Sequence, residues 1–296
     1  MKVAFLVPAR NKERHVRRCV ESVLSQTYPC EILLSDQGST DDTASILKKL
    51  AQSYRGPHTV RLLKCPHLNY RGMPGLNVHM NWLMDQSDAD VFIMTSADDI
   101  TSPHRVKATM RVYQELGPSM VITGQLVANE KTLAYEGQNA RPSQSGWVTS
   151  EEMLRDSVGG STTQSWTRAF FDKVKPLPGI PGLDVFLPFL AIQDKGCYYL
   201  HENLHTYIKY ADPDNTGLEG AWRAGDDTKK TQLEELMHFQ GTTTLYSILA
   251  CMQRNGWMDE TAQAAVYAQI MDRAASWCHI RQNMALARID PIPFKC

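Results

Sequence analysis

The chain has 296 residues, of which 43% are hydrophobic and 21% are charged, and its formal net charge is −1. This composition is typical of a globular enzyme, and the near-neutral charge excludes a global field that would draw the chain to nucleic acid or to an anionic membrane. No apolar run approaches the roughly 20 residues that span a bilayer. The seven cysteines are scattered and form no Cys-x-x-Cys pair, which favours a reduced, cytoplasmic setting and argues against zinc.

Strand and helix patterns alternate over the first 126 residues. Apolar residues at helical spacing follow each of the first four apolar runs, and Asn11 and Thr40 are predicted to cap the first two helices. Such alternation predicts a mostly parallel sheet with helices on both faces. The predicted strands are 3–7, 32–35, 60–63, 91–95 and 120–127.

The second half of the chain is less regular. A capping box at 149–152 predicts a short helix, and further elements are a helix at 183–195 interrupted near Pro188, short strands at 198–200 and 206–210, and a polar loop or lid at 211–227. From residue 228 the pattern is helical, with breaks expected near Gly241 and Asn255. We expect three parts: 1–127 binding a nucleotide, 128–227 completing the same domain on the acceptor side, and 228–296 forming a helical extension. The extension would pack on the core or mediate homo-oligomer formation.

Carboxylates follow two of the predicted strands. Asp36 ends an apolar run and opens a Gly/Ser-rich turn, and Asp98 and Asp99 follow the fourth strand. Ligands bind at the carboxyl ends of strands in an open α/β sheet, and Mg²⁺ or Mn²⁺ takes one or two carboxylates plus substrate phosphates. Asp98 and Asp99 could simply cap the next helix, but together with Asp36 they favour a nucleotide and metal site.

Basic residues crowd the start of the first helix. We interpret Arg10 as a ligand contact and most of the others as a solvated helix face; the set is Arg10, Lys12, Arg14, Arg17 and Arg18. Arg71, which precedes Gly72 and Gly75, is a candidate for a loop that grips phosphate, because glycine lets the backbone approach a ligand closely.

These motifs resemble family 2 glycosyltransferases of the GT-A fold. The segments 8–11, 22–27 and 31–43 are similar to the opening of that family, and 75–77 followed by 89–99 is similar to its middle section with the Asp-x-Asp region. The resemblance covers most of the first hundred residues in order. Weaker matches are 182–184 with the family's Glu-Asp motif and 206–210 with its Tyr-Arg-x-His segment. The implied fold is a Rossmann-like, mostly parallel sheet flanked by helices.

The resemblance also implies an activity and a site. The donor would be a nucleotide-sugar, most often a UDP-sugar, and transfer would proceed with inversion. Asp184 would be the catalytic base, Asp98 would coordinate Mn²⁺ or Mg²⁺, and Asp99 is a second candidate ligand. The implied nucleotide-binding residues, joined by Arg71 from its loop, are Pro8, Ala9, Arg10, Asn11, Glu13, Asp36, Asn77 and Ala97.

Several residues depart from the family pattern. Ser96 stands where the first Asp of Asp-x-Asp is usual, Gln37 replaces a frequent second Asp, Leu183 replaces the Glu before Asp184, and Tyr210 stands where a His is frequent. Together they keep open a metal-independent enzyme or a non-catalytic nucleotide-binding scaffold. A sugar-phosphate nucleotidyltransferase would need a Gly-rich basic loop after the first strand, where 8–11 stand instead. The acceptor stays open among a glycan, a lipid carrier, a protein, a small molecule and a modified base in DNA.

Overall fold

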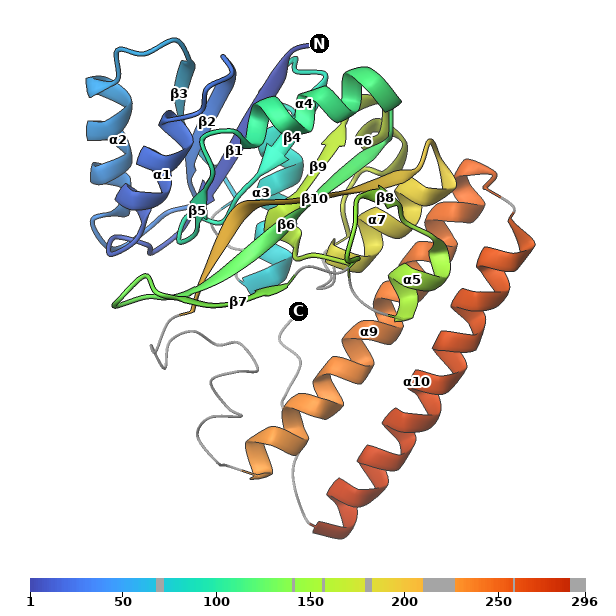
Figure 1. The fold of residues 1–296 in the computed structure, drawn as a ribbon. Helices are drawn as coiled ribbons and strands as arrows, with labels where there is room; N and C mark the ends of the chain where they lie inside the picture. The colour runs from blue at the N-terminus through green and yellow to red at the C-terminus, as the bar shows by residue number, and fades with distance from the viewer. Residues whose placement is uncertain are drawn as a thin grey trace.

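A computed structural model describes residues 1–67, 72–139, 142–155, 158–178, 183–209, 227–257 and 259–287. Within these ranges the strands form one ten-stranded sheet of order β3-β2-β1-β4-β9-β6-β10-β5, with β7 beside β6 and β8 beside β10 (Figure 1). The strands are β1 Val3–Ala9, β2 Glu31–Asp36, β3 Thr59–Lys64, β4 Val91–Met94, β5 Ile100–Thr101, β6 Met120–Asn129, β7 Tyr135–Asn139, β8 Gly146–Trp147, β9 Gln164–Thr167 and β10 Cys197–Lys209.

Helices cover both faces of the sheet, which confirms the predicted α/β class (Figure 1). They are α1 Val16–Leu24, α2 Thr43–Ser53, α3 Gly72–Met84, α4 Arg105–Leu116, α5 Ser150–Arg155, α6 Arg168–Val174, α7 Leu183–Gln193, α9 Asp227–Asn255 and α10 Glu260–Ala287, with a 3-10 turn η1 at Ser161–Thr163.

The alternation of side chains along β1 builds two cores. Val3, Phe5 and Val7 pack in a cluster with residues of α1, α2 and α4. Ala4 and Leu6 face the other way, into a cluster with residues of α3, α6, α7 and α9. Complete burial of one of the larger apolar side chains stabilises the fold by roughly 1.5–3 kcal/mol. The two clusters fix β1 and its neighbours in register, so the loops at their ends are held on a rigid base.

The carboxyl ends of β1, β2 and β4 meet at one edge. β1 pairs in parallel with β2 through Ala9 and Asp36, and with β4 through Leu6 and Met94. β9 runs antiparallel between β4 and β6, so Gln164 at its start lies at the same edge. The predicted candidates Asp36 and Asp98 therefore leave the sheet on the same side.

Four boundaries differ from the predictions. α1 begins at Val16 after His15, and α2 begins at Thr43 after Asp42, so neither Asn11 nor Thr40 caps a helix. α7 is continuous through Pro188, which stands in the middle of the helix. The predicted strands at 198–200 and 206–210 are one strand, β10, whose pairing with β6 shifts register between Leu200 and His205. The shifts leave His201 and Glu202 without partners on β6 before Asn203 pairs with Gly124, and the polar run 201–203 made the strand look interrupted. The predicted lid at 211–227 lies almost entirely outside the described residues.

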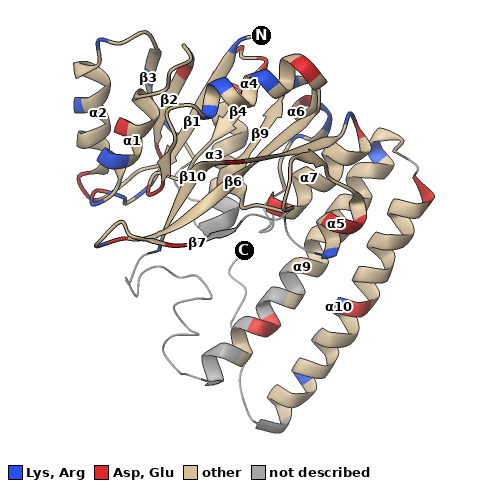
Figure 2. Ribbon diagram, viewed as in Figure 1, with Lys and Arg blue, Asp and Glu red and all other residues tan. Residues whose placement is uncertain are grey.

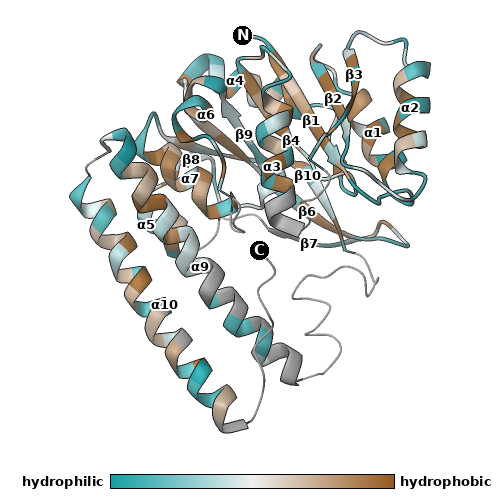
Figure 3. Ribbon diagram, turned by 180° about the vertical axis from the view of Figure 1, so that it is seen from behind, coloured by the Kyte–Doolittle hydropathy of each residue, from teal (hydrophilic) through white to brown (hydrophobic). Residues whose placement is uncertain are grey.

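The C-terminal helices α9 and α10 lie side by side and extend away from the sheet (Figures 1 and 3). α9 runs through Gly241 without the predicted break. A Cβ at Gly241 would overlap the guanidinium of Arg273 on α10, so the glycine makes room for that side chain. Glu235 is almost fully buried, and its Oε1 forms an ion pair with Arg281 Nε at 2.7 Å. In the described part of the chain no helix is long and apolar enough to cross a membrane. A role of these helices in homo-oligomer formation stays a prediction.

Candidate functional site

The loops that follow β1 and β2 are tied together. Asn11 has a left-handed φ of 49°; its N–H donates to Ser39 Oγ at 3.0 Å and its Oδ1 accepts from the Thr40 N–H at 2.9 Å. Glu13 Oε2 accepts from the Asp42 N–H at 3.0 Å. We call these contacts the loop brace. The side chains of Asn11 and Glu13, both predicted to bind the nucleotide, thus hold the loop after β1 against the loop after β2.

Asp36 is fixed at the end of β2. Its carboxylate accepts from the N–H groups of Gly38 at 3.0 Å and Ser39 at 3.2 Å, and from Ser39 Oγ at 2.5 Å. Gly38 has a φ of 68°, which suits glycine because it has no Cβ. The Gln37 N–H donates to the Ala9 carbonyl at 3.0 Å. Asp36 is 7% exposed, so the sheet edge presents a preorganised carboxylate beside Ala9.

Asp98 lies in the segment after β4 and forms an ion pair with a lysine side chain. Its Oδ2 forms an ion pair with Lys12 Nζ, and its Oδ1 accepts a hydrogen bond from Ser96 Oγ. The side chains of Lys12 and Asp98 are 35% and 13% exposed. Ala97, another predicted contact, is buried. The segments after β1 and β4 therefore meet through opposite charges, and Lys12 joins a site from which sequence reasoning had left it out.

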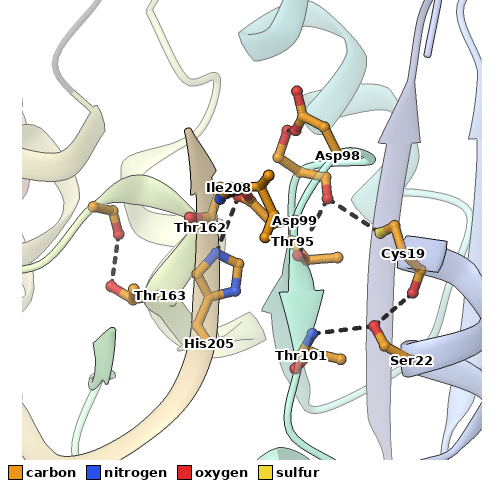
Figure 4. Close-up of polar contacts among 12 residues, drawn as sticks. Cys19, Ser22, Thr95, Asp98, Asp99, Thr101, Thr162, Thr163, His205 and Ile208 are labelled. Atoms are coloured by element: carbon orange, nitrogen blue, oxygen red, sulfur yellow. Dashed lines mark hydrogen bonds and ion pairs between the residues drawn. The ribbon is translucent and has the colours of Figure 1, made fainter. Parts of the chain in front are cut away.

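Asp99 turns away from Asp98 toward β10 (Figure 4). Its Oδ2 lies 3.1 Å from His205 Nε2, and its Oδ1 accepts from the Ile208 N–H at 3.0 Å. Arg105 Nη1 lies 3.4 Å from His205 Nδ1. Burial lowers the pKa of His205, against the opposing effect of Asp99, and burial lowers the pKa of Arg105 to about 9. Asp99 is 2% exposed and bonded to β10, whereas the Asp98 side chain is 13% exposed and paired with a flexible lysine, so Asp98 is the better placed of the two for a ligand.

Further charges surround Asp98. His15 Nε2 lies 3.6 Å from Glu130 Oε1 at the end of β6. Burial lowers the pKa of His15; Glu130 and Asp98 act against that shift, whereas Arg18 and Lys12 add to it. Arg17, by contrast, is exposed and pairs with Glu21 on the surface of α1, whose charges are of both signs (Figure 2). Lys12 thus contacts Asp98 directly, and Arg18 adds positive charge to the same region.

Asn77 holds the segment that leads to α7. It is fully buried, and its Nδ2 donates to the Pro178 carbonyl at 2.5 Å. Asn81, one turn later on α3, exchanges two hydrogen bonds with Leu177, at 3.1 Å and 2.8 Å. Asn77 was predicted near the ribose or the diphosphate, and that role stays a prediction; its amide anchors the chain just before α7. Asp184 is the second residue of α7 and is half-buried.

The remaining predicted positions lie at the end of β1 or outside the described residues. Pro8 and Ala9 are buried at the end of β1, and Arg10 is half-buried just beyond it. Arg71, Gly182 and Tyr210 lie outside the described residues.

The resemblance implies a divalent metal, and the donor atoms at this edge decide whether one fits. Among the residues that the structure describes, no three His, Cys, Asp or Glu side chains are grouped as a metal site. Asp98 offers a carboxylate that already accepts a cationic group, the ammonium of Lys12. Mg²⁺ and Mn²⁺ need one or two carboxylates when water and substrate phosphates complete their coordination. Asp98 therefore fits an ion bound jointly with a diphosphate.

Comparison with known proteins decides the family. The sequence profile described as "Glycosyl transferase family 2" matches residues 4–173. The chain belongs to glycosyl transferase family 2. The match includes β1, β2 and β4 with the segments that carry Asp36 and Asp98, and it ends within α6.

Relatives of this family 2 glycosyltransferase match over part of their length. An uncharacterized glycosyltransferase of Nostoc sp., alr2836, is 25% identical over 115 residues, which are 38% of this chain and 33% of that protein. The chain spans less than half the length of the first curated relatives it matches.

Solved structures share the fold. TarS 1–349 of S. aureus has a TM-score of 0.64 at 16% identity, covering 94% of this chain and 72% of that one. TarS has also been solved in complex with UDP-GlcNAc. The mannosyltransferase PcManGT of Pyrobaculum calidifontis, solved with GDP-Man and Mn²⁺, has a TM-score of 0.56 at 14% identity, covering 97% of this chain and 80% of that one. The GT-A expectation is confirmed at the level of the fold.

Proposed function

We propose that the protein transfers a sugar from a nucleotide-sugar, a UDP-sugar in the first instance, to an acceptor hydroxyl with inversion at the anomeric carbon. One observation carries the proposal: the parallel strands β1, β2 and β4 bring Arg10, Asp36 and Asp98 to a single edge, in a chain that belongs to glycosyl transferase family 2. The nucleotide-sugars in TarS and PcManGT support this class of donor, and they include both UDP and GDP.

Three loops contribute residues to the proposed donor site. Asp36 is held by the turn at 37–39 and would accept hydrogen bonds from the nucleobase. The Arg10 guanidinium would contact the nucleotide from the loop after β1. Asp98 would hold Mn²⁺ or Mg²⁺ together with the diphosphate. A cation bound there would supply positive charge opposite the departing nucleoside diphosphate.

Asp184 is the proposed base. Its carboxylate would take the proton of the acceptor hydroxyl while that oxygen forms a bond to the anomeric carbon. The bond from that carbon to the phosphate oxygen breaks at the same time, and its electron pair leaves with the nucleoside diphosphate. A single displacement of this kind inverts the anomeric centre, and the acceptor would approach from the side opposite the diphosphate.

A thermal-shift titration tests the donor assignment. UDP, GDP, TDP, CDP and ADP are each added with Mn²⁺ or with EDTA to the wild type and to Asp36→Asn and Asp98→Asn. Saturation at about 100 times the dissociation constant adds roughly 2.7 kcal/mol of stability. We expect one nucleotide with Mn²⁺ to stabilise the wild type and both variants to lose this response. No response to any nucleotide would overturn the donor site and would leave a scaffold of this fold that binds no nucleotide.

A further inference from the structure

Lys12 forms an ion pair with Asp98, which is the carboxylate proposed to hold the metal. Lys12 Nζ contacts Asp98 Oδ2, and the other oxygen, Oδ1, accepts from Ser96 Oγ. Ser96 is uncharged, whereas an aspartate at this position of the Asp-x-Asp pattern would place a second carboxylate beside the cation. The ammonium therefore takes a position from which a divalent ion would also approach Oδ2. The two cations compete for the same oxygen.

The backbone of Lys12 is fixed although its side chain is not enclosed. Its N–H donates to Thr43 Oγ1 at 2.7 Å, and its carbonyl accepts from the N–H groups of His15 at 2.9 Å and Val16 at 2.8 Å. The side chain is 35% exposed and has four rotatable carbons, so the ammonium can leave Asp98 without any change in the loop. Lysine is a frequent partner of phosphate, as a point charge with three donors.

We propose that Lys12 is a resident counter-cation of the donor site: its ammonium holds Asp98 while the donor is absent, and it passes to the diphosphate when a divalent ion takes the carboxylate. This inference rests on the proposed donor site. The charges support it, because the diphosphate of a nucleotide-sugar is a dianion, and the divalent ion, Asp98 and Lys12 together neutralise it. Without the diphosphate, the ion would have to displace Lys12 from Asp98, and no phosphate oxygen would compensate for the broken ion pair.

The exchange predicts coupled binding. Metal alone binds weakly, since it must break the Lys12–Asp98 pair, whereas metal and nucleoside diphosphate each strengthen the other. Coupling of two ligands is reciprocal, and values of roughly 5- to 150-fold are typical. The charge of Lys12, rather than its packing, sets the size of this coupling.

Isothermal titration calorimetry of Mn²⁺, with and without saturating UDP, tests the exchange on the full chain. In Lys12→Gln we expect Mn²⁺ alone to bind about tenfold tighter than in the wild type, and the gain in Mn²⁺ affinity caused by UDP to fall by about tenfold. Lys12→Arg keeps the charge and should keep most of the coupling. Lys48→Gln, which removes a lysine from the exposed side of α2, should match the wild type, and Asp98→Asn should lose Mn²⁺ binding.

The outcomes separate the two proposals. Unchanged affinity for Mn²⁺ alone in Lys12→Gln overturns the role of Lys12, as does UDP binding that is equally tight in EDTA and in Mn²⁺. If no nucleoside diphosphate binds the wild type, the donor assignment fails, and the titration with Mn²⁺ alone still decides whether Lys12 competes for Asp98. A circular-dichroism melt of each variant confirms that it is folded before titration.

Discussion

Asp98 and Asp99 are adjacent in the chain, yet their carboxylates serve different partners. Asp98 contacts Lys12 near the surface, whereas Asp99 is buried against His205 at 3.1 Å. The segment after β4 therefore combines a partly exposed carboxylate that is paired with Lys12 and a buried one that ties this segment to β10.

Asp99→Asn should destabilise the fold. The amide offers one acceptor oxygen where the carboxylate offers two, so either His205 or Ile208 loses its partner, and a buried unsatisfied group costs about 1–3 kcal/mol. Urea unfolding measures the change. Asp98→Asn is the matched control: its side chain is more exposed and keeps an acceptor oxygen for Ser96 Oγ, so it should lose less stability than Asp99→Asn. Equal losses in the two variants would contradict the division of roles.

Asp184→Asn should lower the rate of sugar transfer by roughly 10²–10⁴-fold, the range expected for loss of a general base. The affinity for the nucleotide should stay unchanged, because Asp184 is proposed to act on the acceptor. Turnover with the acceptor and UDP calorimetry report the two effects separately. Undiminished transfer would remove Asp184 from the mechanism.

The stability of the protein should fall in mild acid because of His79. This side chain is 1% exposed, lies with Nε2 at 2.7 Å from Ser35 Oγ, and has a pKa that burial lowers from 6.5 to about 4. Since the folded pKa is below the unfolded one, the unfolded chain binds more protons between pH 6.5 and 4. Stability should be constant with respect to this group above pH 6.5 and should fall by on the order of 3 kcal/mol towards pH 4.

The dependence on His79 can be isolated. In His79→Gln the free energy of unfolding, measured by urea titration from pH 7 to pH 4.5, should vary less steeply than in the wild type. His279→Gln, an exposed position on α10, serves as the control. A slope that is identical in His79→Gln and the wild type would show that His79 is not the responsible group.

The loop brace should be sensitive to Asn11. Asn11→Gly keeps the left-handed backbone but removes the acceptor for the Thr40 N–H, at a cost of about 1 kcal/mol. Asn11→Ala adds the penalty of a left-handed Cβ, roughly 1–2 kcal/mol more. Thermal melts should rank wild type, Gly and Ala in that order, and UDP affinity should follow the same order. If the Ala variant were as stable as the Gly variant, a Cβ at residue 11 would not strain the left-handed backbone.

The sequence predicted the elements whose burial shows as a regular pattern. β1, β2 and β4 are continuous apolar runs, and Asp36 and Asp98 follow them at the expected edge. β9 was missed because its four residues, Gln164–Thr167, include two polar side chains that are buried only through pairing with β4 and β6. The ion pair of Lys12 and Asp98 joins residues 86 positions apart, and no local spacing reveals it.

Long-range contacts also determine what other residues do. Asn77, predicted from the family resemblance to bind the nucleotide, donates to the carbonyl of Pro178, 101 residues away. The Gly241 break was predicted from helix propensity, which is a weak prior that tertiary contacts override; here α9 packs along α10 and against α7. In each case a distant segment determines what the residue does.

The loop brace has a consequence for engineering. Because Asn11 and Glu13 bond to the backbone and side chains of 39–42, the segments 9–15 and 36–43 form a single graft unit. A chimera that takes only the second segment from a transferase with another nucleobase preference would leave mismatched partners in the first. Recombination intended to change donor choice in this scaffold should move both segments together and place its junctions inside β1, β2 and the helices that follow them.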